Sequence, residues 1–76
     1  MPELTVRKTA DGYSFVRSDG ECFFMIFRED GSASLYAGAS PDQSPQVCLR
    51  DFDVSVQDKV TAAERMILTY TKTPGG

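Results

Sequence analysis

The chain has 76 residues, of which 41% are hydrophobic, and its 11 acidic and 8 basic side chains give a net charge of -3. One domain of this size has only about 3 to 5 kcal/mol of net stability, which leaves little to support a catalytic cavity. The mild acidity also opposes unspecific attraction to nucleic acids and to anionic lipid. We therefore expect one soluble globular domain, spanning residues 1–76, that is not an enzyme.

Three Asp-Gly pairs divide the first half of the chain into segments rich in Val, Phe, Tyr and Thr. The pairs are Asp11-Gly12, Asp19-Gly20 and Asp30-Gly31. An Asp-Gly pair between such segments is the strongest short-range signal for a hairpin with a two-residue loop. The pattern predicts a four-stranded antiparallel meander with strands at residues 3–9, 13–18, 21–29 and 32–38.

The second half of the chain predicts a loop followed by a helix. Residues 39–46 contain two prolines among small polar residues and cannot continue a central strand. Residues 47–52 fit either a short fifth strand at the edge of the sheet or an irregular lead-in. Beyond them, apolar residues recur at alternating spacings of four and three, which is typical of an amphipathic helix: Val56, Val60, Ala63, Ile67 and Tyr70.

The ends of this helix carry their own signals. Asp53 or Ser55 can serve as the N-cap, and Asp58 completes a box-like Ser55-x-x-Asp58 pattern. Pro74 ends the helix, and residues 73–76 are expected to be a frayed tail. The sequence thus predicts an α+β fold, a four-stranded antiparallel meander with one C-terminal helix packed on one face.

Alternation along the strands sorts their side chains into two faces if each Asp-Gly pair is a two-residue loop. The face expected under the helix holds Leu4, Val6, Ala10, Tyr13, Phe15, Cys22, Phe24, Ile26, Ala33, Leu35 and Ala37. The opposite face is polar at its borders and aromatic in its middle. Its members are Thr5, Arg7, Thr9, Ser14, Val16, Ser18, Glu21, Phe23, Met25, Phe27, Ser34 and Tyr36.

The second face is the candidate binding surface, because a lone helix covers only one side of a sheet. Its centre is expected at Val16, Phe23, Met25, Phe27 and Tyr36, with Arg7 at the rim. Burying five such side chains is worth about 8 to 15 kcal/mol in gross transfer terms, and a monomer seldom exposes such a patch without a use. The sequence leaves three alternatives for what buries this face: residues 39–52 or the C-terminal tail, a second copy in a homodimer, or a different molecule.

Recognition of another protein is the leading functional hypothesis. Phe, Tyr, Met and Arg are favoured at the centres of protein interfaces. In size, acidity and lack of site chemistry the chain resembles the inhibitors that phages and mobile elements make, anti-CRISPR proteins among them, which implies an inhibitor or adaptor. A secondary acidic surface of Asp51, Asp53, Asp58 and Glu64 would fit a groove built for phosphates, or else serves helix capping and solvation.

Single-stranded nucleic-acid binding is the alternative from another class, with Phe23, Phe27 and Tyr36 as stacking residues. The acidic balance opposes it.

Catalytic and cofactor chemistry have no sequence signal. Cys22 and Cys48 lack CxxC spacing and the chain has no histidine, so we expect free thiols, no metal, no cofactor and no small-molecule substrate. The N-terminus has no apolar signal-peptide core, and the longest apolar run, residues 22–27, is too short for a membrane span. We expect a cytoplasmic protein.

Overall fold

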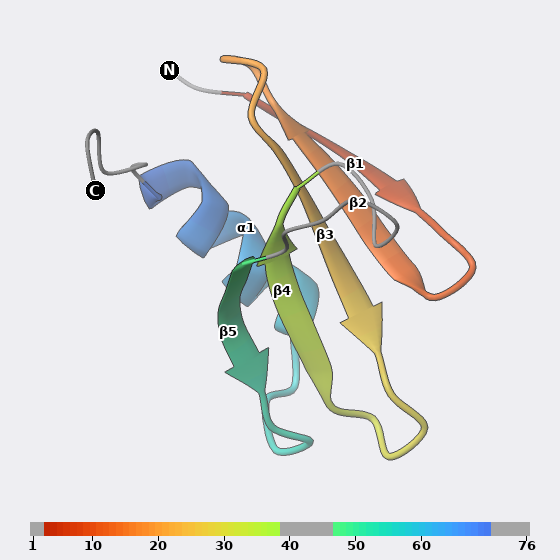
Figure 1. Cartoon of the computed structure of the whole chain (residues 1–76). Helices are drawn as coiled ribbons and strands as arrows, with labels where there is room; N and C mark the ends of the chain where they lie inside the picture. The colour runs from red at the N-terminus through yellow and green to blue at the C-terminus, as the bar shows by residue number, and fades with distance from the viewer. Residues whose placement is uncertain (1–2, 39–46, 71–76) are drawn as a thin grey trace.

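The computed structural model describes residues 3–38 and 47–70. The elements are β1 (Leu4–Lys8), β2 (Gly12–Arg17), β3 (Cys22–Phe27), β4 (Ala33–Ala37), β5 (Val47–Phe52) and α1 (Lys59–Thr69). The strands form one five-stranded antiparallel sheet in the order β1-β2-β3-β4-β5, and α1 lies on one side of it (Figure 1). The predicted α+β meander with a C-terminal helix is confirmed, and residues 47–52 form the fifth strand. The predicted 39–46 loop and the 73–76 tail lie outside the described residues.

The loop between β2 and β3 is one residue longer than predicted. Arg17 N donates to Glu21 O at 2.8 Å and Gly20 N donates to Arg17 O at 2.9 Å, so Ser18, Asp19 and Gly20 form a three-residue loop. Gly20 has φ 92°, the left-handed conformation that glycine adopts without a steric penalty. A turn closed by a left-handed residue is the usual geometry of three-residue hairpin loops.

The loop between β3 and β4 repeats this construction. Arg28 N donates to Ser32 O at 2.8 Å, and Gly31, with φ 93°, donates to Arg28 O at 3.0 Å. Each loop shifts the strand pairing by one residue, so Phe15 pairs with Phe23 and Met25 pairs with Leu35. The first shift turns β3 over relative to β2, and the second restores the predicted facing for β4.

The predicted sorting of side chains is therefore wrong for β3 alone. Phe23 and Met25, predicted on the uncovered face, are each 1% exposed in the core, and Phe27 is half-buried against that core. Cys22, Phe24 and Ile26 point to the opposite face instead. The physical reason is the period of two along a strand, since a slip of one residue exchanges its two sides.

The hairpin between β1 and β2 also departs from the prediction. Lys8 pairs with Tyr13 rather than Phe15, so Ala10 and Asp11 form the loop and Gly12 is the first residue of β2. A Cβ atom on Gly12 would lie 2.1 Å from the backbone O of Met25. This glycine permits the close approach of β2 to β3 and does not supply a positive φ, although the facing of both strands stays as predicted.

The core forms where α1 meets the sheet. Its buried members are Phe15, Phe23, Met25, Ala33, Leu35, Phe52, Ala63 and Ile67. The helix begins later than the apolar spacing indicated, because Asp58 is the N-cap and accepts a hydrogen bond from Thr61 N. The suggested caps Asp53 and Ser55 precede it in a non-helical segment, from which Val56 still packs against the core.

Arg17 joins the end of α1 to the end of β2. Its guanidinium, 9% exposed, donates to Tyr70 O at 2.8 Å and also to Ile67 O, both at the C-terminal end of the helix. Asp19 forms a 2.8 Å ion pair with the same group, and the Phe23 ring centroid lies 5.6 Å away. The carboxylate hydrogen bond raises the pKa of Arg17 and lowers that of Asp19. The charge is thus paired with a carboxylate, and its remaining donors bond to carbonyl groups at the C-terminal end of the helix.

The first prediction concerns the loop that turns β3 over. Gly20→Ala should lower the free energy of unfolding by about 1 to 2 kcal/mol, because a non-glycine residue pays that cost in the left-handed region. Nothing lies within 4 Å of a Cβ atom at this position, so the loss is one of backbone conformation. Gly20→Asn, which tolerates this conformation better, should lose less in urea denaturation. Equal losses of stability for both variants would contradict a left-handed backbone conformation at Gly20.

A second prediction separates the core from the sheet face opposite α1. Phe23→Ala should cost about 3 to 5 kcal/mol, as for other large core aromatics, and so abolish the cooperative unfolding transition of a domain this small. Val16→Ala, at a side chain 45% exposed, should change stability by no more than about 0.5 kcal/mol. Thermal unfolding followed by circular dichroism measures both. A folded Phe23→Ala protein would show that β3 faces the other way.

Candidate interaction surface

The sheet side opposite α1 is the candidate surface and is called the open face below. In the described part of the chain it is formed by Thr5, Arg7, Ser14, Val16, Cys22, Phe24, Ile26, Ser34, Tyr36, Cys48 and Asp51. These residues share a side because each lies opposite another member across a strand pair or two positions along a strand. The helix that the structure describes lies on the far side of the sheet (Figure 1).

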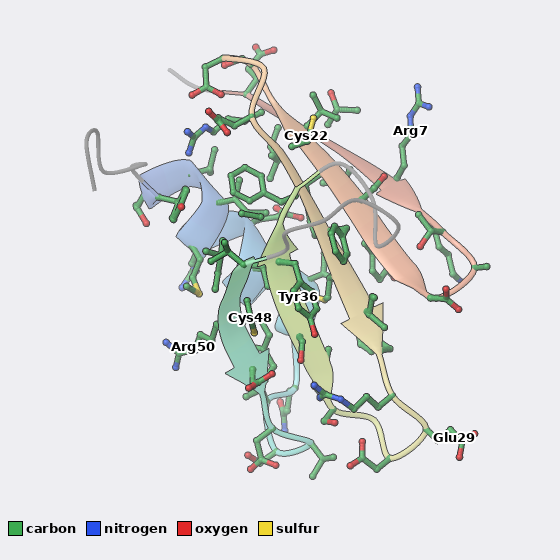
Figure 2. The ribbon with its side chains drawn as sticks, in the orientation of Figure 1. Arg7, Cys22, Glu29, Tyr36, Cys48 and Arg50 are labelled. Carbon is green, nitrogen blue, oxygen red and sulfur yellow. The ribbon has the colours of Figure 1, made fainter. Side chains whose placement is uncertain are left out.

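The apolar centre of the open face is built around an aromatic pair. The rings of Phe24 and Tyr36 stack with centroids 5.0 Å apart and an interplanar angle of 14°. Phe24 is only 3% exposed, whereas Tyr36 is half-buried and lies on the viewer's side of β4 in Figure 2. Val16 is 45% exposed and Ile26 is half-buried. The accessible apolar surface is therefore smaller than predicted and depends on Val16 and Tyr36.

A polar link across three strands borders this centre. Arg28 donates to the Ser34 hydroxyl, which donates to Asp51, and Arg28 Nη2 lies 3.3 Å from Asp51 Oδ1. The serine hydroxyl, followed by the arginine, lowers the pKa of Asp51. A carboxylate with a lowered pKa is a weak base, and the chain has no histidine to activate the serine. The arrangement therefore ties β3, β4 and β5 together without forming a nucleophile.

The structure divides the six predicted site residues equally between the two sides. Arg7, Val16 and Tyr36 lie on the open face, and the Arg7 side chain projects away from the sheet in Figure 2. Phe23, Met25 and Phe27 lie on the helix side, where Phe27 packs edge to face against Tyr13 with centroids 5.9 Å apart. Their places on the open face are taken by Cys22, Phe24 and Ile26. The loop lengths on either side of β3 were the signal that could have identified these three.

The predicted acidic surface does not form one patch. Asp51 points to the open face, Asp53 accepts hydrogen bonds from its neighbours Val54 N and Ser55 Oγ, and Asp58 caps α1. Glu64 lies on the helix, on the other side of the sheet from Asp51. The backbone N–H and hydroxyl of Thr61 lower the pKa of Asp58. Local hydrogen bonding thus accounts for three of these carboxylates.

Both cysteines are free thiols on the open face, with β4 between their strands (Figure 2). Partial burial raises the pKa of Cys48, and the negative charge of Asp51 raises it further. A thiol with a raised pKa is a poor nucleophile at neutral pH. Within residues 3–38 and 47–70, no group of three His, Cys, Asp or Glu side chains is placed to hold a metal ion.

Compared with known proteins, the chain matches no family model, no curated protein and no solved structure. Over the described residues, no helix has the length and apolar character needed to cross a membrane.

The hydrogen bonds of the aspartates predict how stability depends on pH. Hydrogen bonding lowers the folded-state pKa of Asp19, Asp30, Asp51 and Asp58. The carboxylates contribute fully to the free energy of unfolding above their unfolded-state pKa of about 4. This stability is lost as the pH falls through their pKa values in the folded state. Urea midpoints should therefore decrease between about pH 5 and pH 3.

The Asp51→Asn variant tests this linkage, because it removes one of the four carboxylates. Its urea midpoint should decrease less over the same pH range, whereas Glu29→Gln, at an exposed loop residue, should behave like the parent protein. An identical pH response in all three proteins would exclude the Asp51 contribution.

Proposed function

We propose that the chain is a small non-enzymatic protein-binding module that docks on a larger protein through the open face. One observation carries the proposal: three apolar or aromatic side chains lie together on the sheet face away from the described helix. Val16 is exposed, and Tyr36 and Ile26 are half-buried. Tyrosine and arginine dominate the energetics of protein interfaces, and Arg7 stands on the same face. Burial against a partner would remove this apolar centre from water.

Protein is a better partner than single-stranded nucleic acid for this surface. Stacking of bases needs free aromatic faces, but Phe24 is buried and one face of the Tyr36 ring is already occupied by Phe24. Phosphate binding needs several unpaired cations, but Arg28 is hydrogen-bonded to Ser34 and Asp51, which leaves Arg7 in the described part of this face. The net charge of -3 acts in the same direction.

An inhibitor or adaptor is the mode of action that fits these features. Neither needs a cofactor, a metal or a nucleophile, since blocking or joining other proteins requires only affinity and shape. A cytoplasmic location, in which Cys22 and Cys48 stay reduced, is consistent with this role and remains a prediction.

Site-specific photo-crosslinking in cells tests the docking surface. A photoreactive residue at position 36 should attach the protein to its partner, whereas the same residue at Leu68, 39% exposed on the helix, should not. With the purified partner, Tyr36→Ala should weaken binding at least about tenfold in calorimetry, as expected for a central tyrosine. Leu68→Ala is the matched control and should bind normally.

Circular dichroism must show that both alanine variants are folded. Crosslinking from position 68 alone, or normal affinity of a folded Tyr36→Ala protein, would move the partner site to the helix side and overturn the proposal.

A further inference from the structure

The free edge of β1 presents backbone groups that another strand could pair. Among the strands that the structure describes, β1 is the outermost and is paired with β2 alone (Figure 1). Ser18 N donates to Glu3 O and Thr9 N donates to Gly12 O, both at 2.8 Å. Because alternate residues of an antiparallel strand direct their N–H and C=O groups to the same neighbour, Leu4, Val6 and Lys8 direct theirs away from β2.

β1 carries charged side chains, Arg7 and Lys8, which are one usual protection of an edge strand, but it has no bulge. Thr5 to Lys8 are all exposed, and its register with β2 is regular over the whole strand. At the opposite edge, β5 carries an irregularity in its pairing with β4 between Leu35 and Tyr36. Such bulges discourage the addition of a further strand, so β1 is the more receptive edge.

We infer that two copies of this chain associate by pairing their β1 strands antiparallel about Val6, which continues the sheet across the dimer. A two-fold axis at this position uses both backbone groups of all three outward-facing residues. It places Val6 opposite Val6 of the second copy, Leu4 opposite Lys8 and Thr5 opposite Arg7. Like charges are nowhere directly opposite, which is the arrangement that cross-strand pairing favours.

Neighbouring registers fit less well. Moving the axis to Arg7 would place the two arginines directly opposite each other, which is destabilising. Moving it to Thr5 would place Lys8 opposite Pro2, which has no backbone N–H to donate. The axis at Val6 is isologous and closes after two copies, whereas pairing of β1 with β5 of another copy would continue as an open chain.

The pairing keeps both helices on one side of the extended sheet and both open faces on the other. Val6, 37% exposed on the helix side, would be covered by its counterpart. The open face would not be consumed, because Thr5 and Arg7 contribute only its margin. This association is therefore independent of the proposed docking function, and a dimer would present that surface twice.

Sedimentation velocity of the full chain over a hundredfold concentration range tests the inference. The parent protein should shift from monomer to dimer. Val6→Lys, which sets two lysines directly opposite each other, should weaken dimerisation at least about tenfold. Val47→Lys, the same change at a residue 55% exposed on β5, should leave it unchanged. Val6→Glu should also dimerise poorly, but its equimolar mixture with Val6→Lys should form a 1:1 heterodimer.

Amide hydrogen exchange supplies the second readout. The N–H groups of Leu4, Val6 and Lys8 should become protected as the concentration rises, whereas those of Thr5 and Arg7, which face β2, should be protected throughout. A protein that stays monomeric over the whole range, or a dimer that Val6→Lys does not weaken, would overturn the inference. Partner binding through Tyr36 should survive the Val6→Lys change, so failure of this inference and failure of the docking proposal are distinguishable.

Discussion

The length of the two loops that flank β3 is the constraint on which this structure depends. β3 is the middle strand, so its side chains supply the centre of whichever face they join. One additional residue before it and one after it direct Phe23 and Met25 toward Ala63 and Ile67 of the helix. With shorter loops, the same strand would direct Phe24 and Ile26 inward. Two glycines with positive φ thus determine what is core and what is surface.

The sequence predicted the elements and their order but not the facing of β3, and the reason is specific. Segment 22–27 is apolar at both odd and even positions, so its pattern does not distinguish a buried side from an exposed one. An Asp-Gly pair likewise fits a two-residue loop or the end of a three-residue loop. The pair Asp11-Gly12 forms neither kind of loop, because Gly12 is the first residue of β2. Only half of the predicted binding residues therefore lie on the open face.

Arg17 shows how the loop before β3 also affects the helix. Asp19 lies in that loop and holds the guanidinium whose other donors reach the carbonyls of Ile67 and Tyr70. A shorter loop would move this carboxylate and leave a buried positive charge without its ion partner, which costs several kcal/mol in general. The loop that sets the strand register thus also supplies the counter-charge that fixes the end of α1 on the sheet.

The link between Arg17 and α1 has a consequence for the order in which the domain assembles. Strand neighbours in the sheet are also neighbours along the chain, and the three hairpins that join β1 to β4 close short loops. The bonds from Arg17 to Ile67 and Tyr70 span 50 and 53 residues. Loop closure costs more entropy as the span grows, so we expect these contacts to form after the hairpins. The meander is thus the local part of the fold, and we expect the helix to dock late and then to remove Phe23 and Met25 from water.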